Sequence, residues 1–222
     1  MTTSKNSSHY QNENELLKRC QQFEGMTFAQ LARALAIHIP DYPQQRKGWA
    51  GQAIEKALGA SAGNRAIPDF DNLGIELKTI PINHLGKPAE STYITSISLT
   101  GIGQETWLTS QCYAKLKRML WLPIEADKSI AYPHRRIGRA ILWSPSFEDK
   151  QVLQADWEEL TTMIVTGELS KLDAAMGRYL QVRPKAANAS SLGYAFDEKG
   201  NKILTLPRGF YLRSSFTVSV LS

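Results

Sequence analysis

The chain has 222 residues, carries a formal net charge of +5 at pH 7 and is 42% hydrophobic. That is enough apolar sequence for a core without disulfide bonds, and Cys20 and Cys112 are expected to be reduced, buried thiols. The polar N-terminus lacks the apolar stretch of a signal peptide, and no later run approaches the length of a membrane span, so we expect a soluble, cytoplasmic protein with no membrane contact.

The N-terminal quarter of the chain is predicted to be helical. Residues 1–12 are polar and without periodicity, which predicts disorder, and residues 13–222 are expected to form a single domain with two lobes. Apolar residues at helical spacing predict three helices, one beginning after Thr27 as N-cap and the last at 50–58. Glu55 lies outside the apolar stripe of that last helix.

Residues 75–82 alternate apolar and β-branched positions, which predicts a strand after a turn at 71–74. Side chains two apart share a face of a strand, so Glu76 and Lys78 point the same way. If the turn folds Asp69 back, two carboxylates and one lysine converge. Such a group can hold a hard divalent ion and orient a water, as in a phosphodiester-hydrolysing centre.

An acidic residue two places before a lysine is a weak signal, and it occurs at Glu76, Glu148 and Asp197. Glu148 begins a helical pattern and Asp197 lies in a turn, so both pairs are interpreted as solvated charges. Only the pair at Glu76 lies in a strand-like run with an upstream Pro-Asp. From spacing alone, a charged strand edge near a turn remains the alternative.

The middle of the chain predicts further strands and two helices. Residues 91–99 alternate as a second strand, expected to pair with the first as a hairpin, and 110–121 are expected to form a helix. Short apolar runs at 122–124 and 140–143 predict strands of the same sheet. A capped helix is expected at 147–165.

The C-terminal fifth is basic and partly aromatic. Residues 179–182 predict a short strand leading into the loop 183–188, expected to precede a helix and to be placed for phosphate or guanine contacts. Residues 203–206 predict a strand, and 207–213 interleave aromatic and basic residues, as suits groove contacts. The tail after Phe216 is short, so we do not expect a partner contact or a lobe movement that uses it.

Charge is unevenly placed along the chain. Residues 178–222 contain seven basic and two acidic residues, whereas 140–177 contain two basic and seven acidic ones. Residues 115–139 are basic again, with seven against two. This pattern suggests one surface facing a polyanion and another facing water or a protein, although ordinary scatter over solvated faces would also produce it.

Six segments, in order, closely resemble MutH, the family of strand-nicking endonucleases of methyl-directed DNA mismatch repair, which is related to type II restriction enzymes. The resemblance extends over most of the chain, at 47–63, 68–83, 115–127, 156–169, 180–189 and 203–212. It implies an α/β (α+β) fold with a restriction endonuclease-like PD-(D/E)xK core: a mixed central sheet flanked by helices, with two lobes forming a DNA cleft.

The resemblance also assigns residues. The implied catalytic residues are Asp69, Glu76, Lys78, Glu55, Lys115 and Lys47. The metal ligands are expected to be Asp69, Glu76 and Glu55, with the Leu77 carbonyl as a backbone ligand because it lies between Glu76 and Lys78. The residues implied along the DNA are Arg183, Lys185, Arg208 and Tyr211, the last where an adenine methyl group would be sensed.

The implied activity depends on Mg²⁺, one or two ions, with Mn²⁺ able to substitute. It nicks the unmethylated strand of double-stranded DNA on the 5′ side of G at hemimethylated or unmethylated GATC sites. The resemblance implies a monomer that is activated by MutL, a mismatch-repair ATPase, acting with MutS. The chain itself lacks a P-loop, so any ATP requirement is expected to come from its partners. The alternatives are a type II restriction-like enzyme that cuts both strands of GATC, and a non-catalytic DNA-binding module.

Overall fold

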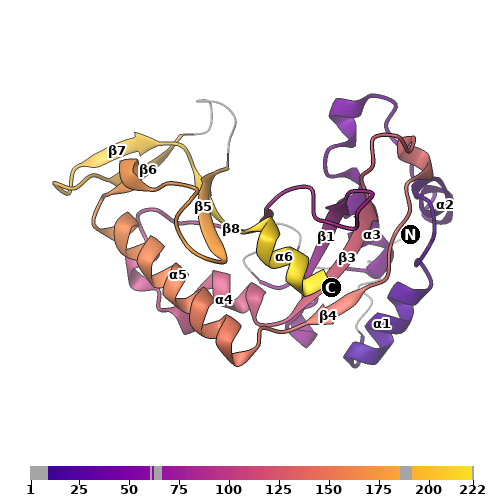
Figure 1. Cartoon of the computed structure of the whole chain (residues 1–222), viewed down its shortest axis with the longest axis horizontal. Helices are drawn as coiled ribbons and strands as arrows, with labels where there is room; N and C mark the ends of the chain where they lie inside the picture. The colour runs from indigo at the N-terminus through magenta and orange to yellow at the C-terminus, as the bar shows by residue number, and fades with distance from the viewer. Residues whose placement is uncertain (1–9, 61, 63–66, 186–191, 222) are drawn as a thin grey trace, which may run out of the picture. The chain divides into compact units, whose positions relative to one another are not determined.

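The computed structural model describes residues 10–60, 62, 67–185 and 192–221 (Figure 1). The chain divides into two compact units. The first comprises Met1–Ala89 and Arg118–Trp143, and the second Glu90–Lys117 and Ser144–Val220, as far as these ranges are described. None of the helices in the described part is both long and apolar enough to cross a bilayer.

The first unit builds its helices around a mixed three-stranded sheet. Its helices are α1 (Glu13–Gln21), α2 (Phe28–Ala34) and α3 (Trp49–Leu58), with the 3-10 turns η1 (Pro43–Arg46), η2 (Asp71–Leu73) and η5 (Tyr132–His134). Its strands are β1 (Glu76–Ile82), β3 (Met119–Glu125) and β4 (Ile141–Trp143). β1 is parallel to β3, and β3 is antiparallel to β4. The predicted fold class and the strands at 75–82, 122–124 and 140–143 are therefore confirmed.

Helix α2 begins after the N-cap that the sequence predicts, and α3 ends where the sequence predicts. Thr27 and Gln30 make a reciprocal capping box at the start of α2, and Gly59 ends α3 with a φ of 68°. Their buried stripes pack with the sheet into one core. That core includes Leu16, Phe28, Leu31, Ile54, Leu58, Ile75, Leu77, Leu120 and Leu122.

The predicted disorder of residues 1–12 does not hold for its last three residues; residues 1–9 lie outside the described part. The Tyr10 hydroxyl donates to the Leu58 carbonyl (2.7 Å), and the Tyr10 ring meets Phe70 edge-on at 5.8 Å. Asn12 caps α1 by accepting from the N–H of Glu15. Residues 10–12, although polar and without periodicity, are therefore held in place by the packing of Tyr10 and by the N-cap of Asn12.

The predicted helix at 110–121 is too long. Ser110 does cap a helix, α4 (Gln111–Leu116), in the second unit, but β3 begins at Met119. Every residue of β3 except the last is buried. A strand buried on both faces is a continuous apolar run, which periodicity alone cannot separate from a helix.

The predicted hairpin between 75–82 and 91–99 is wrong. β1 pairs in parallel with β3 over seven residues, whereas β2 (Thr92–Ser96) pairs antiparallel with β8 in the second unit. Alternation predicts that a segment is a strand but does not select its partner. Here the continuous apolar run of β3 provides the partner for β1. After a turn at Asn83–Lys87 the chain folds back on the end of β1 only as far as Ala89, whose N–H donates to the Pro81 carbonyl (2.9 Å).

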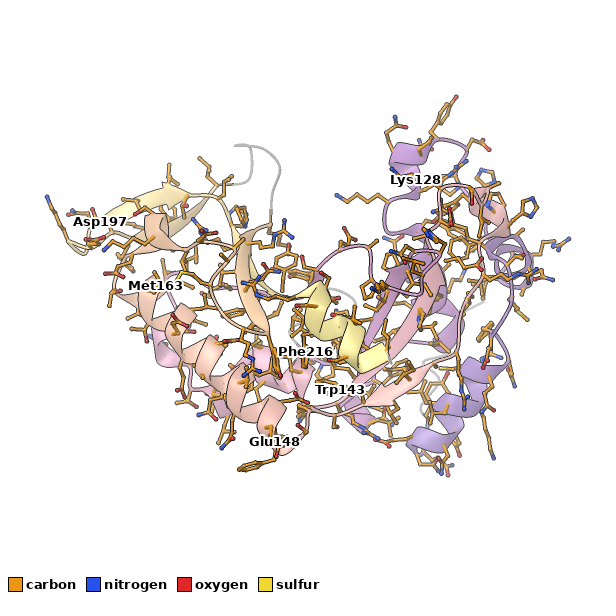
Figure 2. All side chains as sticks on the ribbon, in the orientation of Figure 1. Lys128, Trp143, Glu148, Met163, Asp197 and Phe216 are labelled. Carbon is orange, nitrogen blue, oxygen red and sulfur yellow. The ribbon has the colours of Figure 1, made fainter. Side chains whose placement is uncertain are left out.

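The second unit contains two antiparallel sheets and one long helix. Its strands are β2, β5 (Leu180–Pro184), β6 (Gly193–Phe196), β7 (Lys202–Thr205) and β8 (Arg208–Leu212), ordered β2-β8-β5 and β6-β7. Its helices are α4, α5 (Phe147–Val165) and α6 (Ser214–Leu221), with the turns η3 (Ile102–Gln104), η4 (Trp107–Thr109) and η6 (Leu169–Lys171). Figure 2 shows Glu148 at the start of α5 and Asp197 at the turn of the β6-β7 hairpin.

Helix α5 confirms the predicted helix at 147–165, with Ser146 and Asp149 forming its capping box. Its buried residues include Leu153, Trp157 and Leu160, and Trp157 lies 6.1 Å from the ring of Trp107. The two cysteines are free and buried, as predicted. Burial raises the pKa of the Cys20 thiol to about 11 and that of Cys112 well above its usual value.

Part of the C-terminal prediction falls on residues outside the described part. These include residues 186–188 of the predicted contact loop and the place where the following helix was expected to begin, so β6 is the next described element after β5. The segment 207–213 contains β8, which is the central strand of its sheet. Residues 214–221 form α6.

A buried carboxylate fixes the start of β5. Asp156, on α5, accepts hydrogen bonds from the backbone N–H groups of Arg178, Tyr179 and Leu180 at 2.6 to 2.8 Å. Arg213 donates to the carbonyl of Gly177 in the same turn (2.9 Å). Gly177 has a φ of 75°, and a Cβ there would lie 2.0 Å from the Leu180 carbonyl oxygen, so only glycine fits.

Candidate active site

The turn before β1 folds back as the sequence predicts. Phe70 and Ile75 exchange two backbone hydrogen bonds, with N···O distances of 2.9 and 3.2 Å, and Gly74 takes a φ of 65° to close the turn. Continued by one residue, this antiparallel register sets Asp69 opposite Glu76. The two acids, seven residues apart in sequence, therefore meet at the start of one strand.

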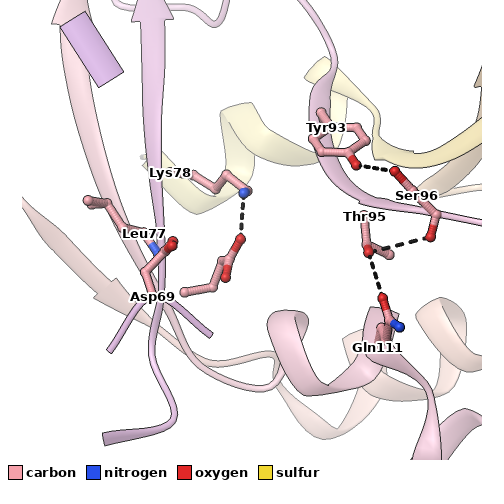
Figure 3. A network of polar contacts seen from close by, with 8 residues as sticks. Asp69, Leu77, Lys78, Tyr93, Thr95, Ser96 and Gln111 are labelled. Atoms are coloured by element: carbon pink, nitrogen blue, oxygen red, sulfur yellow. Dashed lines mark hydrogen bonds and ion pairs between the residues drawn. The ribbon is translucent and has the colours of Figure 1, made fainter. Parts of the chain in front are cut away.

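The edge of β1 receives the Asp69 carboxylate. β1 lies at the edge of its sheet, and the N–H of Glu76 points toward β3, donating to the Arg118 carbonyl (3.1 Å). The next N–H, on Leu77, points to the open edge and donates to Oδ2 of Asp69 (2.9 Å; Figure 3). Because the N–H and C=O of one strand residue point the same way, the Leu77 carbonyl faces that edge too.

Glu76 and Lys78 lie on the same face of β1, as predicted. Nζ of Lys78 donates to Oε1 of Glu76 at 2.6 Å, the contact drawn in Figure 3. Glu76 is only 1% exposed and Asp69 only 9%. Two buried carboxylates with one ammonium carry an excess negative charge, and burying such a charge is costly unless a cation balances it. Carboxylate and carbonyl oxygens are the ligands that Mg²⁺ prefers, so these residues fit that ion.

Glu55 is carried by α3, the helix that lies beside β1 in Figure 1. Its side chain is exposed, but Gly51, one turn earlier on the same helix face, approaches β1 so closely that a Cβ would lie 3.3 Å from Oγ1 of Thr79. The Glu55 face of α3 therefore faces β1. Among the described residues, however, no three acidic, histidine or cysteine side chains form a ready metal-binding group.

The contacts around Asp69, Glu76 and Lys78 do not include Lys47 or Lys115, the two other lysines of the implied catalytic set. Lys47 is exposed, directly before the left-handed Gly48 that starts α3. Lys115 is half-buried on α4 of the second unit. Their assignment rests on the resemblance alone.

The second unit gathers basic and aromatic side chains on one face of the β2-β8-β5 sheet. Tyr93 of β2 pairs with Tyr211 of β8, and their rings meet edge-on with centroids 5.3 Å apart. The Arg183 guanidinium lies 5.9 Å from the Tyr211 ring, and Lys185 Nζ lies 5.1 Å from the Tyr93 ring. Burial raises the pKa of the Tyr211 hydroxyl, with the neighbouring Tyr93 acting in the same direction.

Two serines hold the basic side chains in place. Arg183 Nη1 donates to Ser91 Oγ (2.6 Å), and Lys185 Nζ donates to Ser96 Oγ (2.7 Å). Gly209 lies between them on β8, where a Cβ would lie 2.9 Å from both the Thr95 carbonyl oxygen and Cε2 of Tyr93. Three of the four predicted DNA-contacting residues, Arg183, Lys185 and Tyr211, are therefore brought together.

Arg208 is not part of that face. Along β8 it alternates with Gly209 and Tyr211 and shares its side with the buried Phe210. Its Nη2 donates to the Leu169 carbonyl (3.3 Å), and burial lowers its pKa. The structure thus directs Arg208 toward the interior of the second unit.

The sequence alone did not indicate Tyr93, Ser91, Ser96 or Gly209. These residues belong to a strand and its flanks that looked like the second arm of a hairpin. Only the pairing of β2 with β8 brings them beside Tyr211. The sequence did not indicate which strand is the partner of β2, so it could not indicate these residues.

A mixed sheet flanked by helices, with two acids and a lysine at the edge of its first strand, defines a restriction endonuclease-like protein. The family model described as "DNA mismatch repair enzyme MutH" matches residues 58–156. The chain is 48% identical over 210 residues to DNA mismatch repair protein MutH of Escherichia coli O127:H6 (strain E2348/69 / EPEC), covering 95% of this chain and 92% of that protein. Identity to the protein of the same name from Escherichia coli (strain K12) is 47% over 210 residues, with the same coverage.

The chain therefore belongs to the MutH family. It is an enzyme, an endonuclease of DNA mismatch repair. This membership removes the non-catalytic DNA-binding module from the alternatives.

Proposed function

We propose that this endonuclease is Mg²⁺-dependent and nicks the unmethylated strand on the 5′ side of G at hemimethylated or unmethylated GATC sites. The observation that carries the proposal is the buried pair Asp69 and Glu76, with Lys78 bonded to Glu76 at 2.6 Å, on the open edge of β1. The target sequence comes from the family resemblance. We further propose that the enzyme acts in the cytoplasm as a monomer, activated by MutL with MutS.

The chain's own residues suit the chemistry. Asp69, Glu76 and the Leu77 carbonyl would hold Mg²⁺, and we keep Glu55 as a further ligand because its face of α3 turns toward β1. When bound, the ion supplies a more acidic water and neutralises charge on the phosphate. Lys78 orients the attacking water and adds positive charge at the reacting phosphate oxygen. The expected products are a 3′-hydroxyl and a 5′-phosphate.

DNA contact is assigned to the face around Tyr211. Arg183 offers a planar guanidinium suited to phosphate or a guanine edge, and Lys185 a compact charge suited to phosphate. The Tyr211 ring, held against Tyr93, provides an apolar surface at which an adenine methyl group changes the fit. Arg208 is expected to support β8 through Leu169 rather than to lie on this face.

One assay tests the proposal. A supercoiled plasmid with a single hemimethylated GATC is incubated with the protein and Mg²⁺, with and without MutL, MutS, ATP and a mismatch. We expect nicked circles, more with the activators, and none with EDTA or a fully methylated site. End-labelling then locates the cut. A nick on the methylated strand, or at sites other than GATC, contradicts the proposal.

The remaining alternative is a type II restriction-like enzyme, which acts as a dimer and cuts both strands. The same plasmid separates the two, because a double-strand cut gives linear DNA. Sedimentation of the protein with and without the duplex adds a second readout. A monomer that gives only nicked circles supports the proposal, whereas a dimer that gives linear product supports the alternative.

A further inference from the structure

A cavity of about 540 Å³ lies in the first unit, between α2, the chain that follows it and the segment around His134. Its floor is apolar and is formed by Ala29, Ala32, Ile37 and Ile39. Its rim is basic, with Arg33, His38, His134 and Arg136, and no aspartate or glutamate in the described part of the chain lines it. None of these residues belongs to the candidate active site.

The rim charges are available to a ligand. The Arg33 guanidinium is exposed and makes no hydrogen bond or ion pair with any residue in the described ranges. Arg136 is held in place, because its Nη1 donates to the Gly25 carbonyl at 2.7 Å. The acids near the rim include Asp41, whose Oδ2 lies 3.8 Å from His38 Nε2, and Glu125, which accepts from the backbone N–H of Arg136. Glu24 and Glu125 also line, with Arg136, a second cavity that adjoins this one.

The floor is held by the core. The N–H of Ile37 reaches back to the Ala32 carbonyl (3.0 Å), which forces Ala36 into the left-handed region with a φ of 50°. This tight ending of α2 turns the chain so that Ile37 and Ile39 line the cavity while packing against the core of the unit. A wall anchored in this way is preformed, so binding need not order it.

We propose that this cavity, the α2 pocket, is a docking site for an acidic peptide segment of a partner protein. Its carboxylates pair with Arg33 and Arg136, and an apolar side chain between them lies on the floor of alanines and isoleucines. Guanidinium groups bind carboxylates through two parallel hydrogen bonds, and a basic rim that lacks acidic residues favours an anion.

The shape of the pocket favours a peptide over nucleic acid. A DNA duplex presents its phosphates on a convex rod with a charged surface, which would leave the apolar floor without a matching group. A peptide offers carboxylates and an apolar side chain within a few residues of each other. The cavity volume is also that of a pocket for a few side chains.

The test uses fluorescence anisotropy with three labelled octapeptides, in which Leu, Ile or Phe is flanked on each side by Glu and Asp. Their counterparts carry Gln and Asn instead of the acids, or Gly instead of the apolar residue. We expect the best acidic peptide to bind about tenfold more tightly than either counterpart. If none of the three binds more tightly than its amide counterpart, the proposal is overturned.

Variants locate the binding. Arg33→Glu reverses the rim charge, and Ala29→Gln fills the floor; each is expected to weaken peptide binding about tenfold. Arg139→Glu is the matched control, because it makes the same charge change on an exposed arginine that does not line the α2 pocket. Equal weakening by Arg33→Glu and Arg139→Glu would mean diffuse attraction and would overturn the proposal.

Two further measurements keep this inference separate from the proposed nicking activity. Nicking of plasmid DNA without activators is expected to be unchanged in Arg33→Glu, because the pocket shares no residue with the active edge. A 14-base-pair duplex without GATC should bind equally to wild type and Arg33→Glu. Loss of duplex binding in Arg33→Glu would show that the pocket holds DNA phosphate and not a peptide.

Discussion

The active edge of β1 and the basic face of the β2-β8-β5 sheet are assembled from very different distances along the chain. On the edge, Asp69 bonds Leu77 eight residues away, and Glu76 bonds Lys78 two residues away. On the face, Arg183 bonds Ser91 and Lys185 bonds Ser96, at separations of 92 and 89 residues. The edge is thus a local structure, whereas the face exists only once distant strands have paired.

This difference has a consequence for mutations. A local site is sensitive to its own few side chains, and its geometry is already present in one turn and one strand. A site made of distant strands is sensitive to any residue that fixes those strands, including residues that touch no ligand. Substitutions at supporting positions should therefore damage the face more readily than the edge.

The largest expected effect is at the edge itself. Glu76→Gln and Lys78→Ala are each expected to reduce nicking about a thousandfold or more, because charge stabilisation at the phosphate is lost. Binding to a GATC duplex should remain within a few-fold of wild type, as measured by anisotropy with Ca²⁺. Quenched single-turnover nicking measures the rate.

The control for that experiment is Glu148→Gln. Glu148 has the same spacing to a lysine but is exposed at the start of α5. The Glu148→Gln protein should nick DNA at the wild-type rate. A Glu76→Gln protein that nicks as fast as this control would show that the edge is not the catalytic site.

The next effect is on stability. Asp156→Ala leaves three backbone N–H groups at the start of β5 without their acceptor and should destabilise the protein by roughly 3 to 5 kcal/mol in urea unfolding. Asp173→Ala removes an exposed carboxylate that accepts one N–H, from Ala175, and should cost about 1 kcal/mol or less. If the two variants lose the same free energy of unfolding, Asp156 is not the residue that supports the basic face of the β2-β8-β5 sheet.

A smaller effect, on DNA affinity, should distinguish Arg183 from Arg208, which lie on opposite faces of the β2-β8-β5 sheet. Arg183→Ala is expected to weaken GATC duplex binding about tenfold and to reduce the salt dependence of the affinity, because one phosphate or base contact is lost. Arg208→Ala, on the opposite side of β8, should weaken binding less and lower the melting temperature instead. If Arg208→Ala weakens DNA binding as much as Arg183→Ala without lowering the melting temperature, then Arg208 also contacts DNA and does not face the interior.

The smallest effect concerns Glu55. Gly51→Ala places a Cβ 3.3 Å from Thr79 Oγ1, which should shift α3 slightly and slow nicking about twofold to fivefold while raising helix propensity. The double variant with Thr79→Ala removes the clash and should restore the rate. A single variant that is slow and is not rescued would show that the spacing of α3 from β1 does not govern activity.

Several predictions from sequence held because their physics is local. The cap of α2 at Thr27, the end of α3 at residue 58 and the capped start of α5 at residue 147 each depend on residues within one helical turn. The meeting of Asp69, Glu76 and Lys78 likewise needs only a tight turn and the two-residue period of a strand. Lys47 and Lys115 stay predictions that rest on the resemblance.

The predictions that failed concern partners and burial. Alternation in 91–99 indicated a strand but not that β8 is its neighbour, and the apolar run of β3 was divided between a helix and a strand because burial on both faces hides the period. The predicted place of Arg208 along the DNA stays a prediction, although on β8 its side chain lies on the same side as the buried Phe210 and opposite Tyr211.

By itself, the sequence determined the starts of α2 and α5, the end of α3, the turn at 71–74 and the group of two acids and a lysine, because each is set by steric and hydrogen-bonding preferences over a few residues. Only the tertiary structure decided which strands are neighbours, which side of β8 faces outward and where the α2 pocket forms. Those outcomes depend on pairing and packing between segments far apart in the chain, and the free energy of such contacts is not encoded in any one segment.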